Sequence, residues 1–264
     1  MSMQLATLRD LSVLYRSGST TRTALASVDL DILAGERLAI IGESGSGKST
    51  LALALAGLLP DNAERSGQIA WPGLGRPPVP GGDIGFVFQD PGSSHNPVLS
   101  IGEQIAEVAR RHLGIGWRAA YARALDLLAR VRIPQPKAAL AAYAHELSGG
   151  QRQRVAIASA IAAGPRLLIA DEPTSALDMV VQAEIVALLD ELVRADGMTL
   201  LFITHDIALA SGFADRLAVF RDARLVEAGA SADVLARPQN AYTRHLIGSH
   251  IDLATPPLIV GPTR

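Results

Sequence analysis

Residues 42–49 have the amino-acid types and the spacing of a phosphate-binding loop. They fit the pattern G-x-x-x-x-G-K-[ST], in which glycines let backbone N–H groups approach an anion and the following helix favours its negative charge. Lys48 adds a cation for the outer phosphates, and the Ser49 hydroxyl can ligate Mg²⁺. The candidate nucleotide-binding residues of this stretch are Gly42, Glu43, Ser44, Gly45, Ser46, Gly47, Lys48, Ser49 and Thr50.

The flanking sequence decides between two readings of this loop. An apolar run at 37–41 is typical of a buried strand, and residues 49–56 are rich in strong helix formers. The alternative is a glycine-rich loop that only turns a corner. Because a strand, the complete motif and a helix follow one another, the sequence predicts a site for a nucleoside triphosphate.

Two adjacent carboxylates follow another apolar run. Asp171 and Glu172 come directly after residues 167–170, which predict a buried strand. Hydrolysis needs a carboxylate for the metal and a group that activates water, and strand ends are where parallel sheets carry such groups. Because adjacent strand residues point to opposite sides, we expect Asp171 to face Mg²⁺ and Glu172 to face the attacking water. The alternative is an acidic turn after a core strand.

The elements that position these groups are predicted from hydrophobic periodicity. Residues 4–41 are expected to form short strands, with a polar turn at 16–22 and the alternation of a half-buried antiparallel strand at 26–32. Residues 60–67 are expected to be a polar break, and 71–82 a surface loop. Further strands are predicted at 84–88, 167–170, 199–204, 217–220 and 224–227.

Residues 100–146 change character, because they carry apolar residues at helical spacing without a strand signal. We expect one domain over residues 1–250, with a helical subdomain at about 95–160, and an irregular C-terminal tail at 251–264. Helices are predicted at 101–112, 117–131, 137–143, 148–163, 180–195, 231–236 and 242–247.

Composition excludes several classes of chemistry. The chain of 264 residues has no cysteine, which rules out disulfides, thiolate metal sites and thiol catalysis. Its net charge of −2 and pI of about 6.3 argue against a broad basic face for nucleic acid. No signal peptide is expected at the N-terminus, and the longest apolar run, at 51–59, is too short to span a bilayer. At a membrane, another chain would have to hold this one.

Residues 147–151, Leu-Ser-Gly-Gly-Gln, resemble the signature motif of ABC-type ATPases. The resemblance covers residues 4–250, because the motifs stand in the family's order and spacing. It implies an α/β fold: a P-loop NTPase core with a mixed, mainly parallel sheet, an N-terminal antiparallel β-subdomain and an α-helical signature subdomain. The members bind ATP and Mg²⁺ and dimerise head to tail, with ATP between one phosphate loop and the partner's signature.

The resemblance also implies a role for individual residues. Glu172 resembles the catalytic base, His205 the switch histidine that contacts the γ-phosphate, and Gln89 the loop glutamine that touches Mg²⁺ and couples to membrane subunits. Tyr15 stands where an aromatic residue stacks on adenine, although a strand aromatic is often only packing. The catalytic set is then Lys48, Gln89, Glu172 and His205, the Mg²⁺ ligands are Ser49, Gln89 and Asp171, the signature residues are Ser148, Gly149, Gly150 and Gln151, and residues 175–178 communicate across the dimer.

Finer features are similar to the dipeptide, oligopeptide and nickel group of bacterial ABC importers. They are Phe88-Gln89-Asp90-Pro91, Asn96-Pro97, residues 101–105, 172–178 and 181–183, and Arg237-Pro238 followed by Tyr242-Thr243. The resemblance implies a peripheral ATPase subunit on the cytoplasmic face of the bacterial inner membrane. Its partners would be two integral membrane permease subunits, a second ATPase subunit (a different chain, with an identical one as the alternative) and, indirectly, an extracytoplasmic solute-binding protein. Nucleic acid is not expected as a partner.

The rival reading is a soluble ABC ATPase of DNA repair or translation. Repair members would need a long coiled coil or zinc cysteines, and translation factors usually carry two cassettes, whereas this chain shows one cassette without either feature. No iron–sulfur cluster is expected, since cysteine is absent. Ala223, in a turn where glycine is usual, suggests a different local turn. The remaining histidines, expected to have surface or capping roles and no metal, are His95, His112, His145, His245 and His250.

Overall fold

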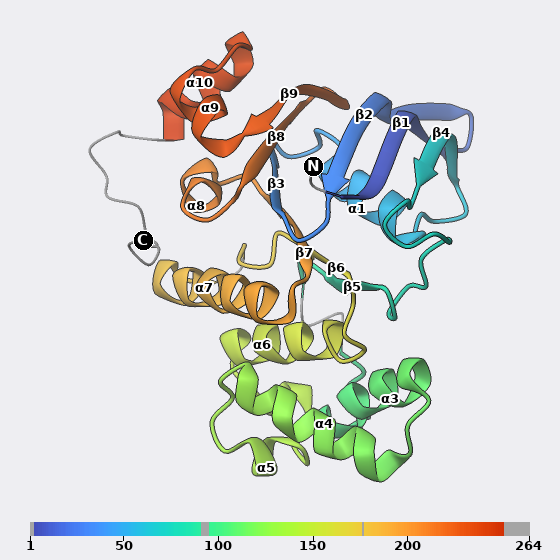
Figure 1. Ribbon diagram of the computed structural model, residues 1–264, viewed down its shortest axis with the longest axis vertical. Coiled ribbons are helices and arrows are strands. Elements are labelled where there is room, and N and C mark those ends of the chain that lie inside the picture. Colours follow the sequence, from blue (N-terminus) through green and yellow to red (C-terminus); the bar gives the residue numbers. More distant parts are fainter. Residues whose placement is uncertain (1–2, 91–94, 176, 251–264) are drawn as a thin grey trace. The chain divides into compact units, whose positions relative to one another are not determined.

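Figure 1 shows the computed structural model, which describes residues 3–90, 95–175 and 177–250. The chain divides into two compact units, one made of residues 1–78 and 198–264 and the other of residues 79–197. The predicted irregular tail at 251–264 lies outside the described residues.

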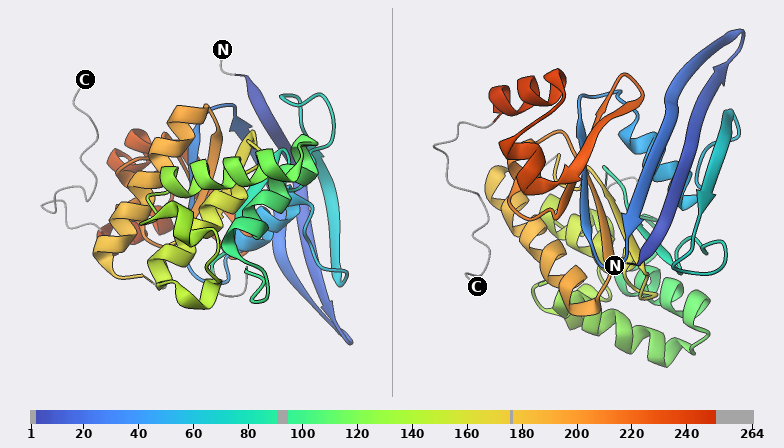
Figure 2. Two further views of the ribbon diagram at one scale, coloured as in Figure 1. Left: turned by 90° about the horizontal axis from the view of Figure 1, so that it is seen from below. Right: turned by 45° about the horizontal axis from the view of Figure 1, so that its top comes forward.

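The first unit begins with an antiparallel sheet of three strands (Figure 2). Apolar Val28, Leu30 and Ile32 are buried, as their alternation predicts. The predicted polar turn at 16–22 is present but shorter, because the two long strands run on until only residues 18 and 19 connect them. In the order of the sheet, the strands are β2 (Thr20–Leu33), β1 (Gln4–Ser17) and β4 (Ala63–Ala70).

The strand β4 corrects the prediction of a polar break at 60–67. Its backbone pairs antiparallel with β1, with Ala63 opposite Tyr15 and Ala70 opposite Thr7. Its side chains are half-buried or exposed, so the strand lacks the apolar alternation by which a strand is recognised in sequence. An edge strand needs a partner for its backbone and can have polar side chains on both faces.

The second sheet of this unit carries the phosphate loop. Strand β3 (Arg37–Gly42) pairs in parallel with β7 (Thr199–Thr204) on one side and with β8 (Arg216–Arg221) on the other, and β9 (Arg224–Ala230) closes the edge antiparallel. Side chains of β3 and β7 are almost wholly buried, as in a sheet covered on both faces. The helices of the unit are α1 (Lys48–Ala56), α8 (Ile207–Ser211), α9 (Ser231–Ala236) and α10 (Ala241–His250).

The β8–β9 hairpin forms at the predicted place but with an unexpected turn. Asp222 and Ala223 have φ of 49° and 64°, which is the left-handed pair of a two-residue type I′ turn. The expectation that Ala223 signals a different turn is therefore wrong. Alanine adopts the conformation that glycine favours, and its carbonyl accepts a hydrogen bond of 2.8 Å from the N–H of Ala26 in β2.

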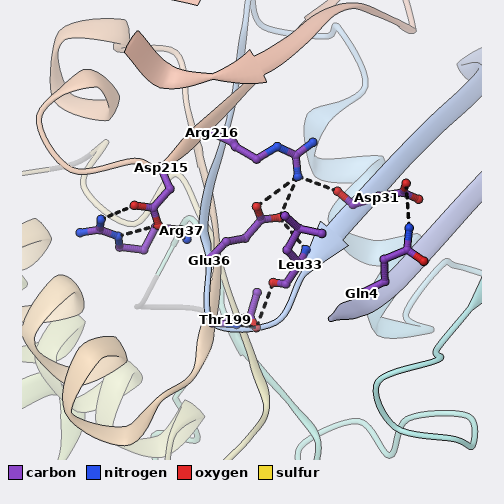
Figure 3. Close-up of polar contacts among 9 residues, drawn as sticks. Gln4, Asp31, Leu33, Glu36, Arg37, Thr199, Asp215 and Arg216 are labelled. Atoms are coloured by element: carbon purple, nitrogen blue, oxygen red, sulfur yellow. Dashed lines mark hydrogen bonds and ion pairs between the residues drawn. The ribbon is translucent and has the colours of Figure 1, made fainter. Parts of the chain in front are cut away.

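Polar contacts join the end of β2 to the beginnings of β3 and β8 (Figure 3). The carboxylate of Glu36 receives the N–H of Leu33 at 2.7 Å and both of its oxygens lie 3.1 Å from Nη1 of Arg216. The same Nη1 donates to the carbonyl of Asp31 in β2 at 2.9 Å. Next to them, Arg37 Nε donates to Asp215 Oδ2 at 3.0 Å. The network fixes the antiparallel sheet to the ends of β3 and β8 that lie away from the phosphate loop.

The second unit contains a pair of parallel strands and a group of helices. Strand β5 (Ile84–Val87) lies beside β6 (Leu167–Asp171), with Val87 opposite Ala170. The predicted short helix at 137–143 is present but shorter, since α5 ends at Ala139 and a turn of 3-10 helix follows at Ala144–Glu146. The α-helices are α3 (Ile101–Leu113), α4 (Trp117–Arg130), α5 (Pro136–Ala139), α6 (Gly149–Ala160) and α7 (Met179–Asp196).

Candidate functional site

The phosphate loop connects the buried strand β3 to helix α1. Gly42 and Gly47 have φ of 151° and 105°, where side chains are disfavoured. A Cβ on Gly42 would overlap the carbonyl oxygen of Phe220, and one on Gly47 would overlap that of Ala24. Neighbouring strands therefore press on the loop from two sides, and only glycine fits at these positions.

Polar groups inside the loop fit a phosphate chain. Helix α1 begins after Gly47 without a side-chain cap, and the N-terminus of a helix favours an anion. Among the described residues, the buried Ser46 Oγ has no hydrogen-bond partner. Lys48 is 4% exposed and its Nζ donates to the carbonyls of Gly42 and Glu43, both at 2.9 Å. A cation, an orphan hydroxyl and N–H groups thus share one loop.

Two side chains from the antiparallel sheet reach this loop. The hydroxyl of Tyr15 lies 3.4 Å from Oγ1 of Thr50 in α1, so the half-buried ring stands at the predicted edge of the nucleotide site. Arg22 places its Nη2 3.4 Å from the point where a Cβ on Gly45 would be. Sequence reasoning missed Arg22, because it was assigned to a polar turn and nothing local connects it to a loop twenty residues away.

His205 follows β7 at the level of the phosphate loop. Thr204 is the register partner of Ile41, so the exposed His205 leaves its strand where the neighbouring strand β3 reaches Gly42. The turn is fixed on the next residue, because Asp206 donates its N–H to Thr204 Oγ1 and accepts from the N–H at the third position of α8, both at 3.0 Å.

The second unit brings Gln89 and Glu172 together. Since Val87 and Ala170 are opposite each other in β5 and β6, both strands deliver their following residues to one edge. Gln89 Nε2 donates to Glu172 Oε2 at 3.1 Å. Asp171, the last residue of β6, is 7% exposed.

Glu172 does not continue strand β6, which corrects the prediction that both carboxylates lie on one strand. β6 ends at Asp171, and Glu172 has a left-handed φ of 44°. Alternation along a strand therefore does not set the direction of the Glu172 side chain. The backbone turn at Glu172 does, and the N–H and Oγ of Ser175 hold it by donating to the Glu172 carbonyl, both at 3.2 Å.

The signature opens helix α6, as predicted. Ser148 is the N-cap: its Oγ accepts from the N–H of Gln151 at 3.3 Å, and Gln151 Oε1 accepts from the N–H of Ser148 at 2.9 Å. A Cβ on Gly150 would be 3.0 Å from Val181 Cγ1, and one on Gly149 would be 3.8 Å from Leu177 Cδ2. The signature therefore packs against residues at the start of α7. Of the predicted loop at 175–178, Ala176 lies outside the described residues.

The other histidines differ in their surroundings. In the described part of the chain, no group of three or more His, Cys, Asp or Glu residues could hold a metal ion. His95 differs from its predicted surface or capping role, because it is 8% exposed and its Nε2 lies 3.1 Å from the carbonyl of Arg152. His145 stacks on Tyr143 with ring centroids 5.8 Å apart. His250 has no described side chain.

No helix within the described ranges is long and apolar enough to cross a membrane. The predicted catalytic and binding residues are distributed over the two units. Tyr15, the phosphate loop and His205 belong to the first unit. Gln89, Asp171, Glu172 and the signature belong to the second.

Comparison with known proteins relates the whole arrangement to one family. A family profile described as ABC transporter matches residues 25–175. The peptidoglycan transport ATP-binding protein YejF of Agrobacterium fabrum is 44% identical over 97% of this chain, which spans 50% of that protein. The oligopeptide transport ATP-binding protein OppD of Bacillus subtilis is 40% identical over 93% of this chain, which spans 72% of it.

Solved structures agree with this relationship. The dimeric ATP-binding cassette MJ0796 in a post-hydrolysis state, bound to ADP and Pi, has a TM-score of 0.74 at 30% identity and covers 86% of this chain and 98% of its own. The cbiO1 protein of Clostridium perfringens, part of the ABC transporter complex cbiONQ, has a TM-score of 0.74 at 29% identity, covering 89% of this chain and 92% of its own. The predicted α/β P-loop fold with an N-terminal antiparallel sheet is confirmed. The chain belongs to the ABC transporter family and is an ABC ATPase.

Proposed function

We propose that this ATPase energises a bacterial importer of peptides or related small solutes. ATP hydrolysis is supported by the hydrogen bond between Gln89 and Glu172 at the ends of two parallel strands. It is also supported by the complete phosphate loop in the other unit. The transport part is supported by relatives that are named as peptidoglycan and oligopeptide transport ATP-binding proteins. Nickel chelates are included as candidate substrates only because the sequence resembles the dipeptide, oligopeptide and nickel group of importers.

Each site residue then has a role. Lys48 and the loop N–H groups hold the phosphates of ATP, and Tyr15 stacks on adenine. Glu172 accepts a proton from the attacking water, and His205 contacts the γ-phosphate. Ser49, Gln89 and Asp171 would hold Mg²⁺, which would lower the negative charge of the phosphates. Oxygen donors of these types suit this hard cation.

We also propose the assembly that such a subunit needs. Two cassettes bind head to tail, so that Ser148, Gly149, Gly150 and Gln151 contact the ATP held by the partner. Helix α6, which the exposed Ser148 caps, would offer the N–H groups of Gly149 and Gly150 to that ATP. Two permease subunits carry the substrate across the bilayer, and a solute-binding protein delivers it. The ATPase is peripheral, on the cytoplasmic face of the inner membrane.

Glu172→Gln tests the proposed chemistry. The amide has almost the shape of the carboxylate but does not accept a proton from water, so we expect ATP turnover to fall by about 10²-fold or more while ATP binding persists. The matched control is Glu191→Gln, a carboxylate of the same unit that is 60% exposed and pairs only with Arg132 in the contacts described. ATPase rate and nucleotide affinity are measured for both. Normal turnover in Glu172→Gln would refute the assignment of the base.

Co-purification tests the proposed transport role. The tagged chain is isolated from membranes of its native host and its partners are identified. Two integral membrane proteins and a second ATPase would support the importer. Recovery of only ribosomal or DNA-bound partners would overturn it in favour of a soluble ABC ATPase, and would leave the hydrolytic chemistry intact.

A further inference from the structure

The C-terminal helix of the first unit contacts the phosphate loop through one side chain. Tyr242 lies in the first turn of α10, and its hydroxyl oxygen accepts the backbone N–H of Glu43 at 3.2 Å. About two hundred residues separate the partners in sequence. In the sequence, Tyr242 marked a resemblance and had no assigned role.

The tyrosine ring is fixed on several sides. It is 5% exposed and packs in an apolar cluster with Ile41 of β3 and Val219 of β8. The Arg221 guanidinium carbon lies 4.7 Å from the ring centroid, a cation–π contact. Figure 1 shows α8, α9 and α10 grouped beside β8 and β9. The hydroxyl is therefore held at a defined place next to the loop.

The backbone before Tyr242 is anchored as well. Glu227 of β9 accepts the N–H groups of Gln239 at 2.7 Å and Asn240 at 3.1 Å. The Asn240 side chain in turn accepts the N–H of Tyr242 at 2.8 Å. These bonds satisfy donors at the beginning of α10 and fix the helix to the sheet. A rigid support thus stands behind the hydroxyl.

Glu43 connects this support to the phosphate-binding lysine. Its N–H donates to Tyr242, and its carbonyl accepts Lys48 Nζ at 2.9 Å. Burial raises the pKa of Tyr242, so the hydroxyl keeps its proton at neutral pH. We infer that Tyr242 is a positioning residue for ATP: by holding the Glu43 peptide, it fixes the first arm of the phosphate loop and the direction of Lys48. This inference rests on the proposed function, because it requires that the loop binds ATP.

Tyr242→Phe in the full chain tests the inference, since it removes the hydroxyl and keeps the buried ring. We expect the Kd and the KM for ATP to rise about three- to tenfold, the range of a lost neutral hydrogen bond, and kcat to stay within about twofold. Amide hydrogen exchange gives a second readout, in which the N–H of Glu43 should exchange faster. The matched control is Tyr121→Phe, at an exposed tyrosine of the other unit. This variant should change neither the affinity for ATP nor the exchange of the Glu43 N–H.

The outcomes separate this inference from the proposed function. Unchanged Kd and unchanged exchange at Glu43 in Tyr242→Phe, with normal ATP binding by the wild type, would overturn the positioning role alone. A wild type that binds no ATP would overturn the proposed function and the inference with it. A fall of kcat at unchanged KM would also contradict the inference, because it would place the effect on the chemical step instead of on nucleotide binding.

Discussion

Replacing Arg216 with Met should destabilise the first unit, because it leaves the carboxylate of Glu36 buried without its cation. Glu36 is 7% exposed, and its remaining described partner would be the N–H of Leu33. Removing one partner from a buried ion pair costs about 3–5 kcal/mol. The Arg216 side chain is 25% exposed, so we expect the lower end, about 3 kcal/mol at pH 7. Typical stabilities of about 5–15 kcal/mol allow the variant to fold.

The pKa of Glu36 determines how the destabilisation by Arg216→Met changes with pH. Burial raises the pKa of Glu36 above its ordinary value of 4.5, while the Leu33 N–H and Arg216 counteract it. The folded state therefore binds more protons than the unfolded state at pH values just above 4.5, and stability falls as the pH rises through this window. Without Arg216 the pKa rises further. The penalty of Arg216→Met should therefore shrink when the pH is lowered from 7 to 5.

Tryptophan fluorescence can follow the unit concerned. The chain has two tryptophans, and Trp117→Phe leaves Trp71, which belongs to the first unit. Urea unfolding in this background gives the free energy of unfolding at each pH. Glu36→Gln is the control, which removes the charge and should make the effect of Arg216→Met smaller and independent of pH. A penalty below about 1 kcal/mol at pH 7, or an equal penalty at pH 5 and 7, would refute the reasoning.

Three further predictions follow from single contacts. Gly47→Ala must place a Cβ against the carbonyl of Ala24 at a φ of 105°, so nucleotide affinity, measured by fluorescent-nucleotide titration, should fall about tenfold or more; unchanged affinity would contradict the loop geometry. Burial raises the pKa of Glu227, but hydrogen bonds donated to its carboxylate outweigh burial, so the pKa is lowered and the stabilisation is present above pH 4.5 and lost as the pH falls. In acid unfolding, the free energy of unfolding of Glu227→Gln should therefore decrease less steeply with falling pH than that of the wild type. Identical slopes for the two proteins would contradict this prediction. Replacing Asp222 and Ala223 by Asn and Gly, which favour the type I′ turn, should raise the free energy of unfolding by about 0.5–1 kcal/mol in urea titrations, and a loss would show that the turn is not strained.

Local patterns correctly predicted the strand–loop–helix element around residues 42–49. The loop at 42–49 joins a strand and a helix as expected, because both neighbours have strong periodicity or propensity. Ser148 opens α6 for the same local reason, through a capping box. In contrast, β4 was missed, since its edge position leaves its side chains exposed and removes the apolar signal.

Contacts between distant segments could not be predicted from patterns. Arg22 beside Gly45 and Tyr242 beside Glu43 depend on how sheet and helix pack after folding, and neither residue type is unusual in its own segment. The network of Glu36 and Arg216 has the same origin, because a single sequence does not reveal which of its charged residues become buried. The candidate reactive groups could therefore be found from short motifs, whereas the residues that hold them in place depend on contacts between distant segments.

The backbone at Glu172 shows why a general strand rule fails at a functional residue. A left-handed φ on a residue other than glycine costs about 1–3 kcal/mol and persists only where surrounding bonds enforce it. Here the carbonyl of Glu172 accepts two bonds from Ser175, and its side chain accepts one from Gln89. The turn therefore determines where the Glu172 side chain leaves the backbone, next to Gln89. In a regular strand, the Glu172 side chain would point to the face opposite that of Asp171. At this turn it instead accepts the hydrogen bond from Gln89.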